Sequence, residues 1–404
     1  MPFEWFVAIR YLRDSRAQTV LILAAVSIGV SVIVFLSALI GGLQASLLKR
    51  TLDTQPHVTL APEELVARPL LRENVRAAVT IERSPQRLQS IHRWRTLLDQ
   101  VERVRGVVAA SPTVTGAAFA SRGVAQRPVV VRAIDPERFV AVVDVRSRVT
   151  RGRYRLTGND VLIGKGLAEL LGSQVGDKVR VSTGDGREAL VIVRGVFDLG
   201  NESIDERWIF VPLRIGQTLF DMPGGASTIE LRVGEVFEAE RIGVELADLT
   251  GLEADSWMKI NEQLLVGLRS QESSKLMIQV FVVIAVALGI ASVLIVSVVQ
   301  KSREIGILRA VGSSSGRVLR IFLIQGGVLG LLGSIVGSAL GAAFSLFFER
   351  LATGPDGSPT FPVDLSPELF VGASALAIGI GLVSALLPAR RASRLDPATA
   401  IRNG

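Results

Sequence analysis

Residues 301–312 carry basic and apolar side chains at a spacing that suits docking onto another protein. Ile305, Leu308 and Val311 recur every three residues, so a helix would place them on one face. The charged residues that would flank this face are Arg303 and Arg309. A short helix of this kind can seat its apolar side in a groove of a partner. The alternative is a basic loop that contacts no partner.

Groups for catalysis or metal binding are sparse. The chain has no cysteine and only two histidines, His57 and His92, which lack metal-ligand spacing. Gly158–Gly166 resembles a phosphate-binding loop, but it has five residues between its first two glycines and no Ser or Thr after Lys165. No pair of carboxylates stands out for acid–base catalysis. We therefore predict a chain that is not an enzyme, with no metal site and no cofactor of its own.

Four charge-free runs are long enough to cross a membrane, for which ~20 apolar residues suffice. They are residues 17–48, 276–300, 321–348 and 369–389. A mean hydropathy of +0.42 with 21% charged residues indicates a few spans plus a large water-exposed domain. The first run is too long for a secretory signal, so it is expected to stay as an anchor. Pro388 predicts that the last helix ends there.

Lysine and arginine gather on one side of this four-span arrangement. Residues 1–16, 301–320 and 390–404 are basic, whereas the loop 349–368 is mainly acidic. The positive-inside rule then predicts cytoplasmic N- and C-termini and an external domain. Aromatic and basic residues in 1–16 favour a helix at the bilayer interface. Because the net charge of +7 lies mostly beside the membrane, nucleic-acid binding is not expected.

Residues 49–259 alternate strand-like and helix-like patterns, which predicts an α+β domain. The expected strands are His57–Ala61, Val107–Val114, Pro128–Ile134, Val161–Gly164, Lys178–Ser182, Leu190–Phe197, Trp208–Pro212 and Thr228–Val233. The expected helices are Leu88–Val104, Gly166–Leu171, Leu213–Phe220 and Phe237–Leu249.

Ile260–Gln300 reads as one helix that forms a stalk and the second span. It contains no proline, and its length would be roughly 60 Å, twice a bilayer core. A rod of this length could carry motion from the membrane to the domain; the alternative is a break near residues 270–274. In the third span, Gly333, Gly337 and Gly341 form overlapping G-x-x-x-G units, which predict close helix packing and, less specifically, a dimer face.

Three segments now point to a family. KSREIGILRAVG at 301–312 resembles the cytoplasmic loop of FtsX/MacB/LolC-type ABC transporter permeases, the type VII or mechanotransmission class. LPARRASRLDPA at 387–398 and IRYLR at 9–13 are similar to the tail and pre-span helix of that family. The start of the loop is closest to the LolC/LolE lipoprotein-releasing permeases. The resemblance covers the whole topology, including an external domain of the MacB-like type.

The resemblance implies an inner-membrane protein whose domain is periplasmic. Two copies of a separate cytoplasmic ABC ATPase would bind ATP and Mg and receive the 301–320 loop as a coupling helix. The implied coupling residues are Arg303, Glu304, Ile305, Gly306, Leu308, Arg309 and Gly312. A second permease, identical or paralogous, would complete the transporter, and a periplasmic lipoprotein carrier or an adaptor is a further implied partner.

The function implied first is extraction of lipoproteins from the outer leaflet of the inner membrane. The expected contacts for cargo, on the outer ends of the first two spans, are Phe35, Leu36, Ile40, Met277, Val280 and Phe281. Each of them also fits an ordinary lipid-facing residue. Two alternatives stay open: a MacB-like efflux permease for amphiphiles or peptides, and, from another class, a membrane receptor that senses a ligand.

Overall fold

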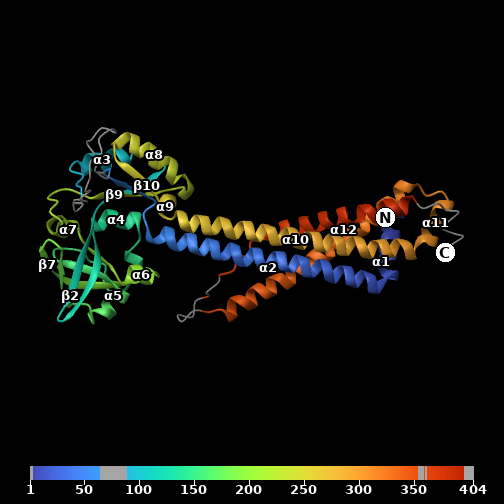
Figure 1. The fold of residues 1–404 in the computed structure, drawn as a ribbon, viewed down its shortest axis with the longest axis horizontal. Coiled ribbons are helices and arrows are strands. Elements are labelled where there is room, and N and C mark those ends of the chain that lie inside the picture. The colour runs from blue at the N-terminus through green and yellow to red at the C-terminus, as the bar shows by residue number, and fades with distance from the viewer. Residues whose placement is uncertain (1–2, 64–88, 354–358, 360–361, 395–404) are drawn as a thin grey trace, which may run out of the picture. The chain divides into compact units, whose positions relative to one another are not determined.

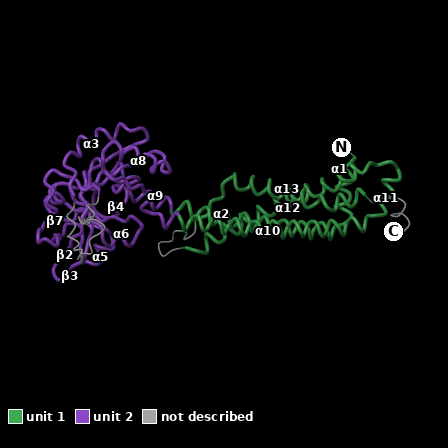
Figure 2. Tube along the Cα trace, turned by 45° about the horizontal axis from the view of Figure 1, so that its top comes forward, with its two compact units in different colours: residues 1–47, 266–404 green, residues 48–265 purple. Residues whose placement is uncertain are grey.

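The computed structural model describes residues 3–63, 89–353, 359 and 362–394. These residues belong to two compact units, coloured separately in Figure 2. The helical unit comprises residues 1–47 and 266–404, and the sheet unit comprises residues 48–265. Each unit has its own hydrophobic clusters and is described separately below.

The helical unit is built from long apolar helices and two short ones (Figure 1). They are α1 Phe3–Asp14, α2 Arg16–Thr54, α10 Glu262–Gln300, α11 Ser302–Ala310, α12 Ser315–Leu351 and α13 Pro367–Ser393. Among the described residues, α2, α10, α12 and α13 are the helices long and apolar enough to cross a membrane. The four predicted spans are therefore confirmed, and α2 and α10 extend well beyond their charge-free runs.

The stalk and second span form one helix, as predicted, but this helix begins at Glu262 instead of Ile260. A short helix α9, Trp257–Ile260, ends at Asn261, where the side-chain Nδ2 donates to the carbonyl of Trp257 at 2.8 Å. From Glu262, α10 then continues to Gln300. The alternative of a break at residues 270–274 is wrong, because α10 is helical throughout that segment.

The prediction that Pro388 ends the fourth span is also wrong. Helix α13 continues past this proline to Ser393. A proline inside a helix removes one backbone hydrogen bond, but here the neighbouring turns are held by burial. Ala385, Ala389 and Ala392 have no exposed surface, and the last two pack in a cluster with residues of α10, α11 and α12.

The sheet unit contains one mixed sheet of ten strands within the described residues. The strands are β1 Val58–Ala61, β2 Val107–Arg122, β3 Ala125–Ile134, β4 Val149–Gly152, β5 Asp160–Gly164, β6 Lys178–Ser182, β7 Glu188–Phe197, β8 Trp208–Pro212, β9 Thr228–Val233 and β10 Glu253–Ser256. The helices that accompany them, besides α9, are α3 Trp94–Val101, α4 Pro136–Val142, α5 Lys165–Leu170, α6 Glu202–Asp205, α7 Leu213–Leu219 and α8 Ala239–Thr250.

Six of these strands pair in a closed ring. The order is β2–β3–β8–β5–β7–β6, and β6 pairs back onto β2. Its inner side is filled by small branched side chains such as Val131, Val181, Val193 and Val211, all fully buried. Closure leaves few strand edges unpaired, which protects a sheet from aggregation.

The remaining strands extend the sheet on the other side of β2, in the order β10–β1–β9–β2. Helices α3 and α8 cover them through Leu98 and Leu246, around the fully buried Trp257. The indole N–H of Trp257 donates to the carbonyl of Val236 at 2.7 Å, so its polar atom is satisfied. The α+β fold class is confirmed for this domain.

Several strands and helices in the sheet unit differ in length from the predicted ones, and some elements were not predicted. The strand expected at 107–114 continues to Arg122, and its partner begins at Ala125 instead of Pro128, because the two form one long hairpin. Gly123 turns the hairpin with a φ of +60°. The predicted helix 88–104 is helical only over Trp94–Val101, and its first residue lies outside the described residues. Elements α4, α6, α9, β4 and β10 were not predicted.

Candidate coupling site and apolar grooves

Helix α11 is a well-terminated helix of nine residues. Gly312 follows it with a φ of +100°, a conformation that glycine adopts without strain. The amide of Ser313 donates to the carbonyl of Leu308, and the amide of Gly312 donates to that of Arg309, both at 3.1 Å. This pair of bonds is the Schellman termination, so Gly312 acts first as a helix stop.

One face of α11 packs against other helices of the same chain. Ile305 is 1% exposed and lies in a cluster with Val298 of α10, Phe322 of α12 and Ala392 of α13. Leu308 is half-buried against a second cluster, formed by α1 and α12. Gly306 is also buried. Since these positions are filled from within the chain, the apolar face that the sequence assigned to a partner is mainly an internal contact.

The opposite face of α11 is accessible. Ile307 is 49% exposed and Val311 is 83% exposed. Arg303, Glu304 and Gly312 are exposed as well, whereas Arg309 is half-buried. The sequence pattern missed Ile307, because a three-residue spacing grouped Val311 with the buried Ile305 and Leu308. The predicted coupling residues thus divide between two faces of the helix.

Charged contacts fasten the start of α11 to α1. Lys301 Nζ lies 2.9 Å from Glu304 and 4.0 Å from Asp14. The same ammonium lies 5.4 Å from the centre of the Tyr11 ring, within range of a cation–π interaction. Burial, and then the charge of Glu304, raise the pKa of Tyr11 to about 12, so this phenol stays neutral. Helix α11 is therefore held to α1 by charge and to α12 by apolar packing.

The predicted packing glycines of α12 lie against α2. A Cβ on Gly337 would stand 2.6 Å from the carbonyl oxygen of Ser27, and one on Gly341 would stand 2.9 Å from that of Ser31. Gly333 would meet Val26 more closely still. These glycines allow α12 to pack closely against α2 of the same chain. Because α2 covers this surface, the glycines are not available as a dimer face.

An apolar groove of about 420 Å³ lies between α2 and α12. Phe35 is the one predicted cargo residue that lines it, and its ring meets Phe348 edge-on with centroids 6.0 Å apart. The other lining residues are Ile28, Ser31, Val32, Leu340, Phe344 and Phe347. The groove is large enough for a segment of hydrocarbon chain.

A second groove, of about 290 Å³, lies between α2 and α10 and is partly polar. Ile40 lines it, together with Ser274, Lys275 and Ile278. The remaining predicted cargo residues lie on α2 or α10 without lining either groove: Leu36 is half-buried, and Met277, Val280 and Phe281 are about half to two-thirds exposed. The structure thus places Phe35 and Ile40 in different grooves and three of the other residues on an exposed face of α10, and it leaves Leu36 half-buried on α2.

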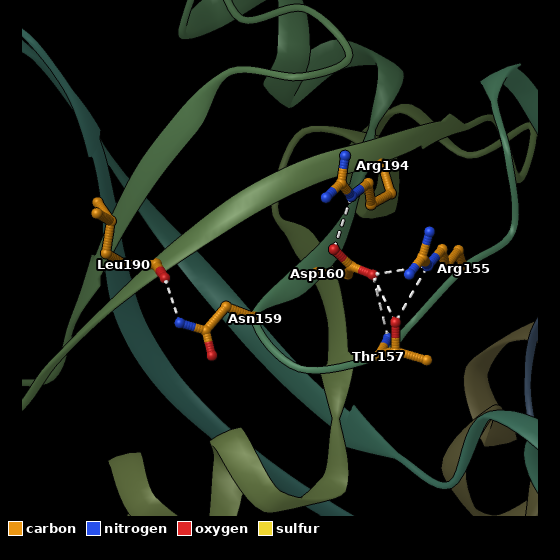
Figure 3. A network of polar contacts seen from close by, with 6 residues as sticks. All are labelled: Arg155, Thr157, Asn159, Asp160, Leu190 and Arg194. Carbon is orange, nitrogen blue, oxygen red and sulfur yellow. Dashed lines mark hydrogen bonds and ion pairs between the residues drawn. The ribbon is translucent and has the colours of Figure 1, made fainter.

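The segment that resembled a phosphate loop, residues 158–166, contains all of β5 and the first two residues of α5. Figure 3 shows Asp160 held between two arginines: Arg194 Nε lies 2.7 Å from its Oδ1, and Arg155 Nε lies 3.5 Å from its Oδ2. The hydroxyl of Thr157 donates to the same carboxylate at 3.0 Å. Burial alone would raise the pKa of Asp160, but the hydrogen bonds from Arg194 and Thr157 outweigh it and hold the pKa below its ordinary value.

The glycines of this segment are required by packing. A Cβ on Gly164 would collide with the backbone of Asp205, and one on Gly166 would stand 2.7 Å from the side chain of Glu206. Lys165 lies 3.6 Å from Asp198, an acidic partner instead of a phosphate. This segment is therefore a structural part of the domain, as the departures from a phosphate-loop pattern suggested.

Metal-ligand geometry does not occur among the described residues, where no three His, Cys, Asp or Glu side chains converge. His57 is buried, with Nδ1 3.1 Å from the carbonyl of Val233. Burial lowers the pKa of His57 and favours its neutral form. This histidine joins β9 to the start of β1, which is a structural role.

Comparison with known proteins identifies both units. Residues 19–249 match the MacB-like periplasmic core domain, and residues 276–397 match the FtsX-like permease C-terminal region. The lipoprotein-releasing system transmembrane protein LolC of Neisseria meningitidis serogroup B is 24% identical, across 99% of each chain. The macrolide export ATP-binding/permease protein MacB of Neisseria gonorrhoeae is 36% identical over 114 residues, which is 28% of this chain and 17% of that protein.

The periplasmic region of MacB from Actinobacillus actinomycetemcomitans is a structural neighbour with a TM-score of 0.35 and 11% identity, over 53% of this chain and 94% of that structure. The two sequence matches together cover most of the domain, most of each of the four apolar helices and the loop that contains α11. The chain belongs to the FtsX-like permeases that carry a MacB-like periplasmic core domain.

Proposed function

We propose that this ABC transporter permease releases lipoproteins from the outer leaflet of the inner membrane. The observation that carries the proposal is the extent of the similarity to LolC, which includes 99% of both chains and therefore the domain and all four spans. A shared domain or a shared loop alone would fit many transporters. Similarity across both units favours a shared task.

In this proposal, a separate ABC ATPase supplies the energy. It binds ATP and Mg, in two copies, and contacts the accessible face of α11 in the cytoplasm. Arg303, Glu304, Ile307 and Val311 are the contacts that this face offers. Because Ile305 and Leu308 join α11 to α1, α10, α12 and α13, a push on α11 would move the helices as a body.

In this proposal, α2 and α10 are the helices that hold the cargo. Both helices are 39 residues long and apolar over an 18-residue window, so each can cross the bilayer and continue beyond it. The exposed Met277, Val280 and Phe281 would hold acyl chains until the periplasmic domain passes the lipoprotein to a carrier. A second permease, identical or paralogous, would complete the site.

Efflux is the second candidate. It is favoured by the 36% identity to MacB in a shared segment of 114 residues. In this case the same coupling by α11 would drive amphiphiles or peptides toward an adaptor, and the cargo would not need a covalent lipid.

The test uses the permease purified with its ATPase and reconstituted into liposomes. One set of vesicles contains a triacylated lipoprotein, and the matched set contains the same protein without its acylated cysteine. ATP-dependent transfer of only the acylated form to a soluble acceptor supports lipoprotein release. Transport of a fluorescent amphiphile without lipoprotein transfer would favour efflux instead.

A further inference from the structure

A third cavity, of about 530 Å³, lies where α10 ends, α11 begins and α13 ends. Its lining combines apolar side chains with two arginines and a hydroxyl. The lining residues are Ile295, Val298, Val299, Ser302, Pro388, Arg391 and Arg394. The function proposed above assigns nothing to this cavity.

The order of these residues along the helices matches the depth profile of a bilayer. The charge-free runs of α10 and α13 end at Gln300 and Ala389. The apolar lining lies within those runs, and Arg391 and Arg394 follow about 3 and 8 Å beyond the end of the second run, at 1.5 Å per residue. The apolar part therefore lies at the depth of acyl chains and the arginines at the depth of headgroups.

The cavity is positively charged. Arg391 and Arg394 are three residues apart, so they share one side of α13, and among the described residues no carboxylate lines the cavity. Glu304 is the acidic residue of the adjoining α11, and Lys301 already pairs with it at 2.9 Å. Across residues 3–63, 89–353 and 362–394, neither of the two guanidinium groups forms an ion pair. The C-terminal end of α13 carries the partial negative charge of the helix dipole, which disfavours an anion. The arginine side chains must therefore supply the attraction.

We propose that this cavity binds an anionic phospholipid, with the phosphate on Arg391 and Arg394 and the first methylenes against Val299 and Pro388. A soluble phosphate would use the arginines but would leave the apolar lining unexplained. Val299 is 67% exposed, and a lipid chain would cover it. Basic cavities between membrane helices are suited to anionic headgroups. This inference does not depend on the cargo or on the ATPase.

The test is native mass spectrometry of the full chain in detergent, titrated with phosphatidylglycerol or phosphatidylcholine of identical acyl chains. Each arginine near a membrane surface contributes about 1 kcal/mol toward an anionic lipid, so two should favour phosphatidylglycerol roughly 30-fold. The double variant R391Q/R394Q should lose most of this preference. R390Q removes one positive charge from a neighbouring residue that is exposed but outside the cavity, so it is the matched control for the single variant R391Q.

A second variant tests the apolar lining without changing charge. Val299→Trp should fill the cavity and weaken the binding of both lipids, although both arginines remain. Equal binding of the two lipids by the unmodified chain would overturn the proposal, and so would an equal loss of preference in R390Q. Binding of glycerol phosphate as strong as that of the lipid would assign the site to soluble phosphates. Displacement of the lipid when the ATPase or a second permease binds would assign it to a protein interface.

Discussion

The two faces of α11 predict opposite effects for two isoleucines of the coupling loop. Ile307 is 49% exposed, and Ile305 is 1% exposed. If the accessible face contacts the ATPase, Ile307→Ala should weaken that complex and leave the fold intact. Ile305→Ala should do the reverse, since its side chain fills an internal cluster.

The magnitudes follow from burial. Fully burying an isoleucine contributes about 1.5–3 kcal/mol, so covering the exposed half of Ile307 contributes about 1 kcal/mol, or roughly fivefold in Kd. Ile305→Ala removes buried methyl groups and leaves a cavity, at a cost of about 2–5 kcal/mol of folding stability.

The assay measures two quantities on each variant: the Kd for the ATPase in detergent and the unfolding temperature. Val311→Ala, on the same exposed face, should follow Ile307→Ala. Normal ATPase binding by Ile307→Ala, together with weaker binding by Ile305→Ala at an unchanged unfolding temperature, would show that the exposed face is not the docking face.

Three further predictions concern other parts of the chain. Gly337→Val should lower the unfolding temperature, because its Cβ would stand 2.6 Å from Ser27 and overpacking costs about 1–3 kcal/mol; Gly372→Ala, which meets nothing within 4 Å, is the control. Asp160→Asn should destabilise the domain at neutral pH but not in acid. The lowered pKa of Asp160 contributes stability above its unfolded-state pKa, and this stability is lost as the pH falls through the folded-state pKa. In urea unfolding, the free energies of unfolding of the two proteins should therefore differ at pH 7 and converge at low pH. Phe281→Ala should slow ATP-dependent lipoprotein release. The unfolding temperature should change little, because the Phe281 side chain is 67% exposed. A normal release rate would show that Phe281 does not contact the cargo.

The sequence predicted the spans well because composition alone controls them. A charge-free run of twenty or more residues has no alternative to burial in lipid or protein, and all four such runs are helical. The mixed fold of the domain was also predictable, since short branched runs alternated with turn residues. The closed ring of six strands was not, because β6 pairs with β2 across a long sequence separation.

Two errors have a common physical origin in tertiary packing. Local preference predicts that Pro388 ends a helix, but fully buried alanines on either side of it keep α13 helical. Periodicity placed Ile305, Leu308 and Val311 on one docking face, but it could not show that α10, α12 and α13 already cover Ile305. A pattern identifies an apolar face; only the structure shows which surface covers it.

If the exposed face of α11 meets a cytoplasmic ATPase, residue 307 lies on the cytoplasmic side and is covered when the ATPase binds. The chain has no cysteine, so a single cysteine at position 307 can be labelled without background. In inverted membrane vesicles, which present the cytoplasmic side, we expect rapid labelling by an impermeant maleimide and protection when the ATPase binds. Labelling only in right-side-out vesicles, or no protection by the ATPase, would contradict it.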